Sequence, residues 1–337
     1  MVSIKDIAAE CGVSTATVSK ALNDHDDVGN ATKERVREAA KRLGYMPNSL
    51  ARALKTKKSY NIGVLMVDKA NSGLQHHYFA AILDSFKVEM EHSGYDLTFI
   101  SSHVGDSSYS YYEHCMYRNV DGVLAACVDF TAPEVQRLLN SELPIVSIDY
   151  IADEKYTAAS DNEQGIRDLL EYALKKGHTR IAYIYGDESQ VTQARLRAFR
   201  EVLADHHCKV NERFLKPAKY LQPDEAFQLT LELLREEQPP TCILYPDDIC
   251  AVSGVEAIRE CGLTEGKDVS VMGYDGTPLL QALRPSLTTI RQDTETIGKK
   301  AAELLLKLIR KENVPLPERV QYCPGTLLEG ETVGTPA

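Results

Sequence analysis

The chain of 337 residues contains no tryptophan, no Cys-X-X-Cys pair and no run of 18 apolar residues. A transmembrane helix needs a run of about that length, so the sequence predicts no membrane span and no membrane partner. The first residues, MVSIKDIAAECGVS, mix charged and apolar side chains, unlike the basic and then apolar segments of a secretory signal. The eight cysteines are scattered, which is typical of reduced thiols in a cytoplasmic protein. We therefore expect a cytoplasmic location.

The sequence also lacks the short motifs of common enzymes, since it holds no G-x-G-x-x-G, G-x-S-x-G or H-E-x-x-H. The segment from Gly262 to Lys267 resembles a phosphate-binding loop. It has three residues instead of four between its glycines, and Asp268 replaces the Ser or Thr. We interpret it as a helix end followed by a turn. The histidines form no second cluster at metal-ligand spacing. We expect a protein with no catalytic residues, no cofactor and no metal.

Charge is unevenly distributed along the chain. The formal net charge is −11, yet residues 1–58 hold 11 Lys and Arg against 7 Asp and Glu, a net charge of +4. The other residues hold 27 against 42, a net charge of −15. A small basic segment on an acidic body is typical of a protein with a separate DNA-binding domain. The excess of four positive charges is modest and does not decide the function alone.

Three short helices are predicted in the first 46 residues. Ser3 is a suitable N-cap, and Gly12 ends the helix that Ser3 begins. The second helix opens at Ser14, and a third amphipathic helix ends at Gly44. Two short helices joined by so tight a glycine turn form a helix-turn-helix. The motif alone leaves open a three-helix bundle that merely has a polar face.

In a helix-turn-helix the second helix lies in the major groove, and side chains near its N-terminus contact base edges. Thr15 and Ala16 are short enough to contact a thymine methyl group, and Lys20 can donate to guanine. These three residues are the predicted base-reading positions. The side chains suited to phosphate contacts, which position a protein without reading sequence, are Thr17, Asn23, Thr32 and Arg35.

The following residues predict a hinge. Pro47 ends one element, and Asn48 is suited to cap a helix of about seven residues, which is marginal in water without a partner. Leu50 and Leu54 lie four apart, on one face of such a helix. An exposed leucine beside basic residues suits a wedge between base steps in the minor groove of kinked DNA. The residues predicted for this contact are Leu54, Arg52 and Lys55.

From residue 60 onwards, short apolar runs alternate with segments of helical periodicity. The runs span residues 60–68, 95–101, 120–127, 143–149, 180–186, 213–220, 241–246, 269–274 and 287–291. Such alternation predicts parallel sheets covered by helices on both faces. The predicted fold class is a small all-α helix-turn-helix headpiece plus an α/β body of two doubly wound parallel-sheet subdomains.

Ligands of open α/β sheets bind at the carboxyl ends of the strands. Carboxylates, an amide and an arginine make paired hydrogen bonds there, and aromatic rings offer flat faces, as a polyhydroxylated sugar requires. Asp248 is instead predicted to cap the helix that follows it, a common role for an aspartate after a strand. The predicted effector-binding residues are Tyr78, Phe79, Asp149, Tyr150, Asp161, Asn162, Arg195, Tyr220, Asp247 and Asp275.

The runs SIKDIAAECGVSTATVSKALN and TKERVREAAKRLGYMPNSLARALKTKKSYNIGVL resemble the headpiece and hinge of the lactose-repressor (LacI/GalR) family, and the resemblance continues over nearly the whole chain. It implies a homodimer on a pseudo-palindromic operator, with Leu54 as the hinge leucine and Thr15, Ala16 and Lys20 at base-reading positions. It also implies a body similar to periplasmic sugar-binding proteins, in which two lobes close over an effector.

This resemblance implies a division into domains and an effector pocket. The domains are a headpiece over 1–46, a hinge helix and linker over 47–59, and an effector-binding and dimerisation domain over 60–333, whose N-subdomain covers about 60–161 plus 293–323 and whose C-subdomain covers about 162–292 plus 324–333. The family often has an uncharged residue at the position of Asp247. An additional carboxylate there favours a hydroxyl-rich or cationic ligand.

The expected function is transcriptional repression of carbohydrate transport or catabolism genes, with release from double-stranded operator DNA when a small sugar binds. Two alternatives stay open. One is a purine-type repressor that needs a corepressor. The other is a catabolite-control-type regulator whose corepressor is a phosphocarrier protein, as in one branch of the family. The C-terminal tail has no leucine heptads, which argues against a coiled-coil tetramer and favours a homodimer.

Overall fold

The structure is a computed structural model that describes residues 2–46, 58–67, 73–153, 155–282 and 284–336. The chain divides into two compact units, Met1–Ser59 and Tyr60–Ala337. The predicted hinge residues Leu54, Arg52 and Lys55 lie outside the described residues.

The first unit contains the three predicted helices, α1 (Ile4–Cys11), α2 (Thr15–Leu22) and α3 (Asn30–Leu43). Ser3 and Asp6 form a capping box at the start of α1, and Gly12 ends it in the left-handed region at a φ of 61°. The side chain of Ser14 accepts a hydrogen bond from the backbone of Thr17 and so caps α2. Apolar faces of all three helices meet in one small core. The predicted helix-turn-helix is therefore confirmed.

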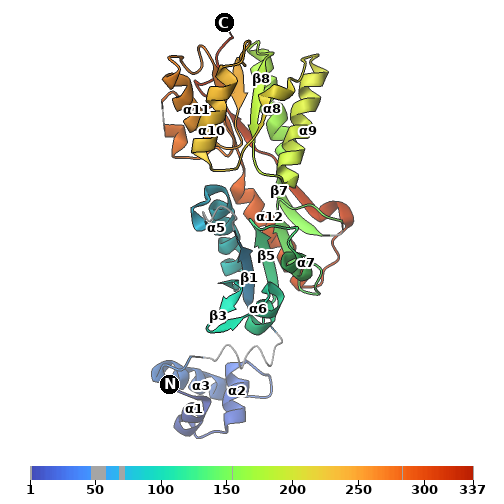
Figure 1. The fold of residues 1–337 in the computed structure, drawn as a ribbon. Helices are drawn as coiled ribbons and strands as arrows, with labels where there is room; N and C mark the ends of the chain where they lie inside the picture. The colour runs from blue at the N-terminus through green and yellow to red at the C-terminus, as the bar shows by residue number, and fades with distance from the viewer. Residues whose placement is uncertain (1, 47–57, 68–72, 154, 283, 337) are drawn as a thin grey trace. The chain divides into compact units, whose positions relative to one another are not determined.

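The second unit contains two subdomains, each built on its own parallel sheet (Figure 1). The N-subdomain has a six-stranded sheet in the order β13-β7-β6-β5-β1-β2. Its strands are β1 (Asn61–Met66), β2 (Asp96–Phe99), β5 (Gly122–Ala126), β6 (Ile145–Ile148), β7 (Tyr156–Ser160) and β13 (Val320–Cys323), beside a hairpin of β3 (His103–Val104) and β4 (Ser107–Ser108). Its helices are α5 (His77–His92), α6 (Tyr111–Arg118), α7 (Pro133–Leu139) and α12 (Thr294–Ile309), with the short η1 (Gly73–Gln75) and η4 (Leu316–Glu318).

The C-subdomain has a four-stranded sheet in the order β11-β10-β8-β9. Its strands are β8 (Ile181–Tyr185), β9 (Leu215–Pro217), β10 (Cys242–Leu244) and β11 (Ser270–Met272), with a separate antiparallel pair of β12 (Thr289–Arg291) and β14 (Thr326–Leu328). Its helices are α8 (Asn162–Lys175), α9 (Gln190–Asp205), α10 (Pro223–Leu234) and α11 (Asp248–Glu260), with the short η2 (Glu212–Phe214) and η3 (Leu280–Ala282).

Helices cover both faces of each sheet because successive strand residues point to opposite sides. In β8, Tyr183 packs into the core beneath α8 and α9, whereas Ile184 packs into the core beneath α10 and α11. In β5, Leu124 faces the core shared with α5 and α12, and Val123 faces the core shared with α6 and α7. The predicted two doubly wound subdomains are therefore confirmed.

The chain crosses between the subdomains three times. The crossings lie between β7 and α8, between β12 and α12, and between β13 and β14. Each of the nine predicted apolar runs contains one of the observed strands. No helix among the described residues is long and apolar enough to cross a membrane.

Candidate functional site

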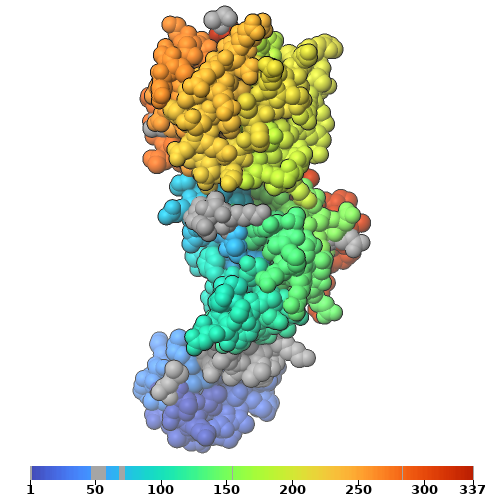
Figure 2. Space-filling model, viewed as in Figure 1, coloured from blue at the N-terminus to red at the C-terminus, as the bar shows by residue number. Residues whose placement is uncertain are grey.

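A cleft of about 600 Å³ lies beside the crossing between β7 and α8. Residues of both subdomains line it, among them Asp149 and Ser160 from the N-subdomain and Asn162, Gln190 and Arg197 from the C-subdomain. In Figure 2 the blue and green surface of the N-subdomain meets the yellow and orange surface of the C-subdomain along one boundary. The cleft is thus at the carboxyl ends of strands, where the sequence places the effector.

Arg195 lies behind the cleft lining, is only 3% exposed and bonds to Asn162, which lines the cleft. Its Nε donates to Oδ1 of Asn162 at 2.8 Å, and its Nη1 donates to the carbonyl oxygen of Pro246 at 2.9 Å. Its guanidinium carbon lies 3.5 Å from the ring centroid of Tyr274 and 5.9 Å from that of Tyr220. Two hydrogen bonds and an aromatic face therefore fix both the position and the plane of the positive charge.

Asp149 faces Arg195 from the N-subdomain. It follows β6 with a φ of 56°, and its two oxygens accept hydrogen bonds from the Tyr78 hydroxyl at 2.6 Å and the Ser160 backbone at 2.9 Å. Burial raises the pKa of the Asp149 carboxyl, while these two hydrogen bonds and the charge of Arg195 partly oppose the rise. The two subdomains thus present opposite charges to each other.

Asp275 lies on the C-subdomain side of the same site. It has a φ of 108°, and its Oδ1 accepts a hydrogen bond from Nε2 of Gln292 at 2.6 Å. Burial raises the pKa of Asp275 well above its usual range, the carboxylates of Asp248 and Asp247 raise it further, and Arg195 lowers it.

Asp247, not Asp248, caps α11. Asp247 is the N-cap of α11, where its Oδ1 accepts from the Cys250 backbone at 2.8 Å and its Oδ2 from the Leu221 backbone at 2.8 Å. The prediction that Asp248 caps this helix is wrong. Asp248 is the first helical residue, and its carboxylate accepts from the Thr277 backbone and the Thr289 hydroxyl. Backbone groups therefore occupy both oxygens of Asp247. The expected preference for a hydroxyl-rich or cationic ligand no longer follows from an additional carboxylate at this position.

The other predicted effector residues have different surroundings. Asp161 caps α8 by accepting from the backbone of Gln164 at 3.0 Å, and it lines the cleft. The Tyr220 hydroxyl pairs with Thr192 at 2.9 Å on the Arg195 side. Phe79 packs edge-on against the ring of Tyr78, and Tyr150 stacks on Phe130 with ring centroids 4.2 Å apart. Tyr150 therefore contributes to the core beneath α6 and α7.

Three residues of the site were missed from the sequence. Tyr274 supplies the face on which Arg195 lies, and Gln292 holds Asp275. Both adjoin the carboxyl end of a strand, β11 or β12, so the strand-end rule could have found them. The buried Ser160 hydroxyl has no hydrogen-bond partner in the structure and belongs to a cleft-lining residue. Its strand was not predicted, because its sequence, YTAAS, has little apolar bulk.

The predicted base-reading residues lie together on the solvent side of α2. Thr15, Ala16 and Lys20 are exposed, whereas Val18 and Ala21 are fully buried on the opposite side. This is the arrangement a recognition helix needs in order to insert its outer face into a groove.

The predicted phosphate-contacting residues surround this face. Thr17 pairs with the Ser14 hydroxyl at 2.8 Å, and Asn23 donates to the carbonyl oxygen of Ser19 at 2.6 Å. Thr32 is half-buried and Arg35 is exposed on α3. The Thr17 hydroxyl thus contacts the N-cap residue at the start of α2, and the Asn23 amide bonds to the last turn at its end.

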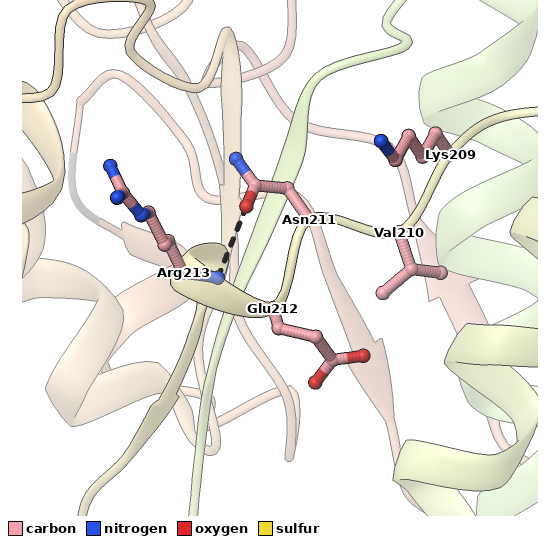
Figure 3. A pocket seen from close by; sticks show the side chains of 5 residues that line it. All are labelled: Lys209, Val210, Asn211, Glu212 and Arg213. Carbon is pink, nitrogen blue, oxygen red and sulfur yellow. Dashed lines mark hydrogen bonds between the residues drawn. The ribbon is translucent and has the colours of Figure 1, made fainter.

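A second hollow lies on the loop between α9 and β9 (Figure 3). Five consecutive residues, from Lys209 to Arg213, are its whole lining, and Asn211 Oδ1 accepts from the Arg213 backbone at 3.1 Å. This bond caps η2. The hollow is a feature of one loop, with no group from a strand end, and we assign it no functional role.

Two family descriptions match this chain. "Bacterial regulatory proteins, lacI family" matches residues 3–48, and "Periplasmic binding protein-like domain" matches residues 170–333. The chain is 32% identical to the HTH-type transcriptional repressor PurR of Aliivibrio fischeri (strain MJ11), over 93% of each chain. It is 29% identical to PurR of Vibrio cholerae serotype O1 (strain M66-2), over 92% of each.

Solved structures give the same result. The Lac repressor dimer bound to operator and the anti-inducer ONPF has a TM-score of 0.83 and 28% identity, covering 100% of this chain and 99% of that one. The regulator CelR in complex with cellobiose shares the fold at a TM-score of 0.71 and 24% identity, covering 98% of this chain and 100% of that one. The headpiece and the two-lobed body define a DNA-binding transcriptional regulator. This chain belongs to the LacI family.

Proposed function

We propose that this protein is a sequence-specific repressor that binds a pseudo-palindromic operator as a homodimer and responds to a small molecule in the cleft beside Arg195. The observation that carries the proposal is the union, in one chain, of an exposed Thr15–Ala16–Lys20 face on α2 with a cleft whose charged groups come from both subdomains. The exposed face of α2 would contact the bases of the operator. A ligand in the cleft would change the relative position of the two subdomains.

The proposed ligand is a small carbohydrate. Arg195 and Asp275 present a guanidinium and a partly exposed carboxyl on one side, and Asp149 presents a second carboxyl from the other. Groups of this kind pair with neighbouring hydroxyls of a sugar, and the aromatic ring of Tyr220 supplies an apolar face, while the ring of Tyr274 supports Arg195 from behind. A purine is the second candidate, because the curated relatives are named PurR and a planar base also suits the face of Tyr220.

The proposed response follows from linkage. A ligand that contacts Asp149 and Arg195 together favours one relative position of the subdomains and so changes the population of the DNA-binding conformation. An inducing sugar would weaken operator binding, and by reciprocity the operator would weaken sugar binding by the same factor. A corepressing purine would reverse both signs. The direction of the response therefore separates the two candidates.

The proposed dimer surface includes η1, α5 and β2 of the N-subdomain. These neighbouring elements expose the large apolar side chains of Leu74, Val88 and Phe99. Exposed apolar side chains on adjoining elements mark surfaces that bind other proteins. We expect Val88→Glu to raise the monomer fraction in analytical ultracentrifugation and to weaken operator binding. Leu316→Glu, at an exposed position on η4, is the matched control and is expected to change neither.

The test of the function is selection of full-length protein against randomised duplex DNA. We expect a pseudo-palindrome with a flexible pyrimidine–purine step at its centre. The selection is run with protein alone, with a sugar panel, with purine bases and with a phosphorylated phosphocarrier protein, and the selected site is then titrated under the same four conditions. Weaker binding with a sugar supports the first candidate, and stronger binding with a purine base supports the second. Absence of any preferred sequence under all four conditions contradicts the proposal.

A further inference from the structure

A glutamine side chain joins the two subdomains at the rim of the cleft. Gln190 is the first residue of α9 in the C-subdomain, and Ile151 follows β6 in the N-subdomain. Oε1 of Gln190 accepts a hydrogen bond from the Ile151 backbone amide at 2.7 Å, and Nε2 donates to the Ile151 carbonyl oxygen at 2.9 Å. The side-chain amide therefore uses both its donor and its acceptor on one residue of the other subdomain.

The same two segments carry the charged groups of the ligand site. Helix α9 holds Arg195 one and a half turns beyond Gln190, and the loop after β6 holds Asp149 two residues before Ile151. Burial raises the pKa of Asp149 and the positive charge of Arg195 opposes that rise, so the two groups interact across the cleft. The hydrogen bonds at the rim and the charge attraction inside thus act between the same helix and the same loop.

We propose that Gln190 is a positioning residue that fastens the Asp149-bearing loop to the Arg195-bearing helix and so holds this side of the ligand cleft in the arrangement that the structure shows. Both hydrogen bonds lie on the exposed rim, where each contributes only modestly because water competes for the same groups. Gln190 therefore favours this arrangement of the subdomains without fixing it. This inference does not depend on which ligand binds, and a wrong ligand class would leave it intact.

Only an amide satisfies both Ile151 groups at neutral pH. Methionine has nearly the same length and shape but cannot donate. A glutamate carboxylate can accept from the amide of Ile151 but repels its carbonyl oxygen, whereas a protonated glutamate can donate and accept like glutamine. Gln190→Glu should therefore restore the link as pH falls toward the ordinary carboxyl pKa of about 4.3, and Gln190→Met should not.

The experiment measures amide hydrogen exchange at Ile151 in the full-length protein by mass spectrometry with residue-level fragmentation. For Gln190→Met we expect exchange about tenfold faster than in the wild type at neutral pH, the loss corresponding to two weak hydrogen bonds. Gln193→Met is the matched control, because Gln193 lines the same cleft from the same helix but donates to Glu188 within its own subdomain. Amide exchange at Ile151 in Gln193→Met should equal that in the wild type.

The second arm compares Gln190→Glu with Gln190→Met from pH 7.5 to pH 4. Other ionisable groups line this cleft, namely Asp149, Asp161, Glu163, Arg197 and Tyr322, and both variants retain them. The ratio of the two exchange rates therefore isolates residue 190. We expect a ratio somewhat below one at pH 7.5, where the carboxylate can still accept from the Ile151 amide, and a further several-fold fall toward pH 4, where the protonated side chain also donates to the Ile151 carbonyl oxygen. A flat ratio, or wild-type exchange at Ile151 in Gln190→Met with unchanged thermal unfolding, overturns the proposal.

Discussion

The guanidinium carbon of Arg195 lies 3.5 Å from the ring centroid of Tyr274, the residue immediately before Asp275. Gly165 on α8 leaves the space that Tyr274 occupies, because a Cβ at position 165 would lie 2.2 Å from the tyrosine hydroxyl. One helix glycine thus lets a tyrosine approach closely enough to support a buried charge. Desolvation opposes that charge, and the surrounding tyrosines and Asp275 favour it.

Arg195→Met is expected to abolish the ligand response while operator binding is retained, because the headpiece is a separate compact unit. The substitution removes two hydrogen bonds, to Asn162 and to the Pro246 carbonyl, and leaves buried acceptors without a donor. Fluorescence anisotropy of the selected operator, titrated with the active sugar or purine, measures the response. Arg200→Met on the same helix removes only an exposed pair with Glu212, outside the cleft lining, and serves as control. An unchanged response in Arg195→Met would contradict its role.

Lys20→Ala is expected to weaken operator binding by about 1–3 kcal/mol and to relax the preference at one base pair. The reason is that Lys20 is exposed on the outer face of α2, where a base-edge contact would be lost. Repeating the DNA selection with the variant measures both effects. A loss of the same size on every sequence, with a smaller salt dependence, would make Lys20 a phosphate contact instead.

Asp27→Asn is expected to strengthen operator binding by about 0.2–1 kcal/mol. Asp27 forms an exposed ion pair with Lys20, so DNA competes with this carboxylate for the lysine. The hydrogen bond from Lys20 also lowers the pKa of Asp27, which keeps the carboxylate charged at neutral pH. Operator affinity at two salt concentrations is the measurement. If Asp27→Asn still raises operator affinity in a Lys20→Ala background, the rise comes from the loss of a negative charge near DNA and not from release of Lys20.

Ser14→Ala is expected to lower the free energy of unfolding of the headpiece by about 1 kcal/mol. The Ser14 hydroxyl accepts from the Thr17 backbone at 3.0 Å, and without it the first turn of α2 lacks its side-chain cap. Amide exchange within α2 in the full-length protein should accelerate about tenfold. Ser19→Ala lies on the same helix away from the cap, and equal acceleration there would show that the cap is not the cause.

Asp248 is expected to make the body less stable as pH rises. Burial raises the pKa of its carboxyl from 3.8 to about 7, against the opposing hydrogen bonds from Thr289 and Thr277. The folded state therefore binds more protons than the unfolded state between those two values, so stability falls as pH rises from about 4 to about 7. The slope from this group is at most about 1.4 kcal/mol per pH unit.

Asp248→Asn tests this dependence, because asparagine can still accept from the Thr277 backbone and donate to the Thr289 hydroxyl. Urea unfolding at pH 5 and pH 7.5 should show a smaller difference for the variant than for the wild type. Equal differences for the two proteins would mean that Asp248 stays charged throughout this range.

The secondary structure that local sequence encodes was predictable. Strands with bulky apolar residues, such as β1 and β5, follow directly from the sequence, and Ser3, Gly12 and Ser14 mark the helix ends of the headpiece. Strands β7, β13 and β14 and the short hairpin strands β3 and β4 were missed. The sequence of β7 is YTAAS, and β13 is an edge strand with a single buried residue that enters the N-subdomain sheet from the far end of the chain.

What the sequence determined by itself is the order of elements, the recognition face of α2 and the placement of polar residues after strands. Helix caps and periodicity depend on residues a few positions apart, and strand ends meet at one edge wherever strands run parallel. What only the tertiary structure decided is which of these residues meet: Arg195 with Tyr274, and Gln190 with Ile151. Those contacts depend on three crossings between the subdomains and on close packing, which join segments far apart in the chain.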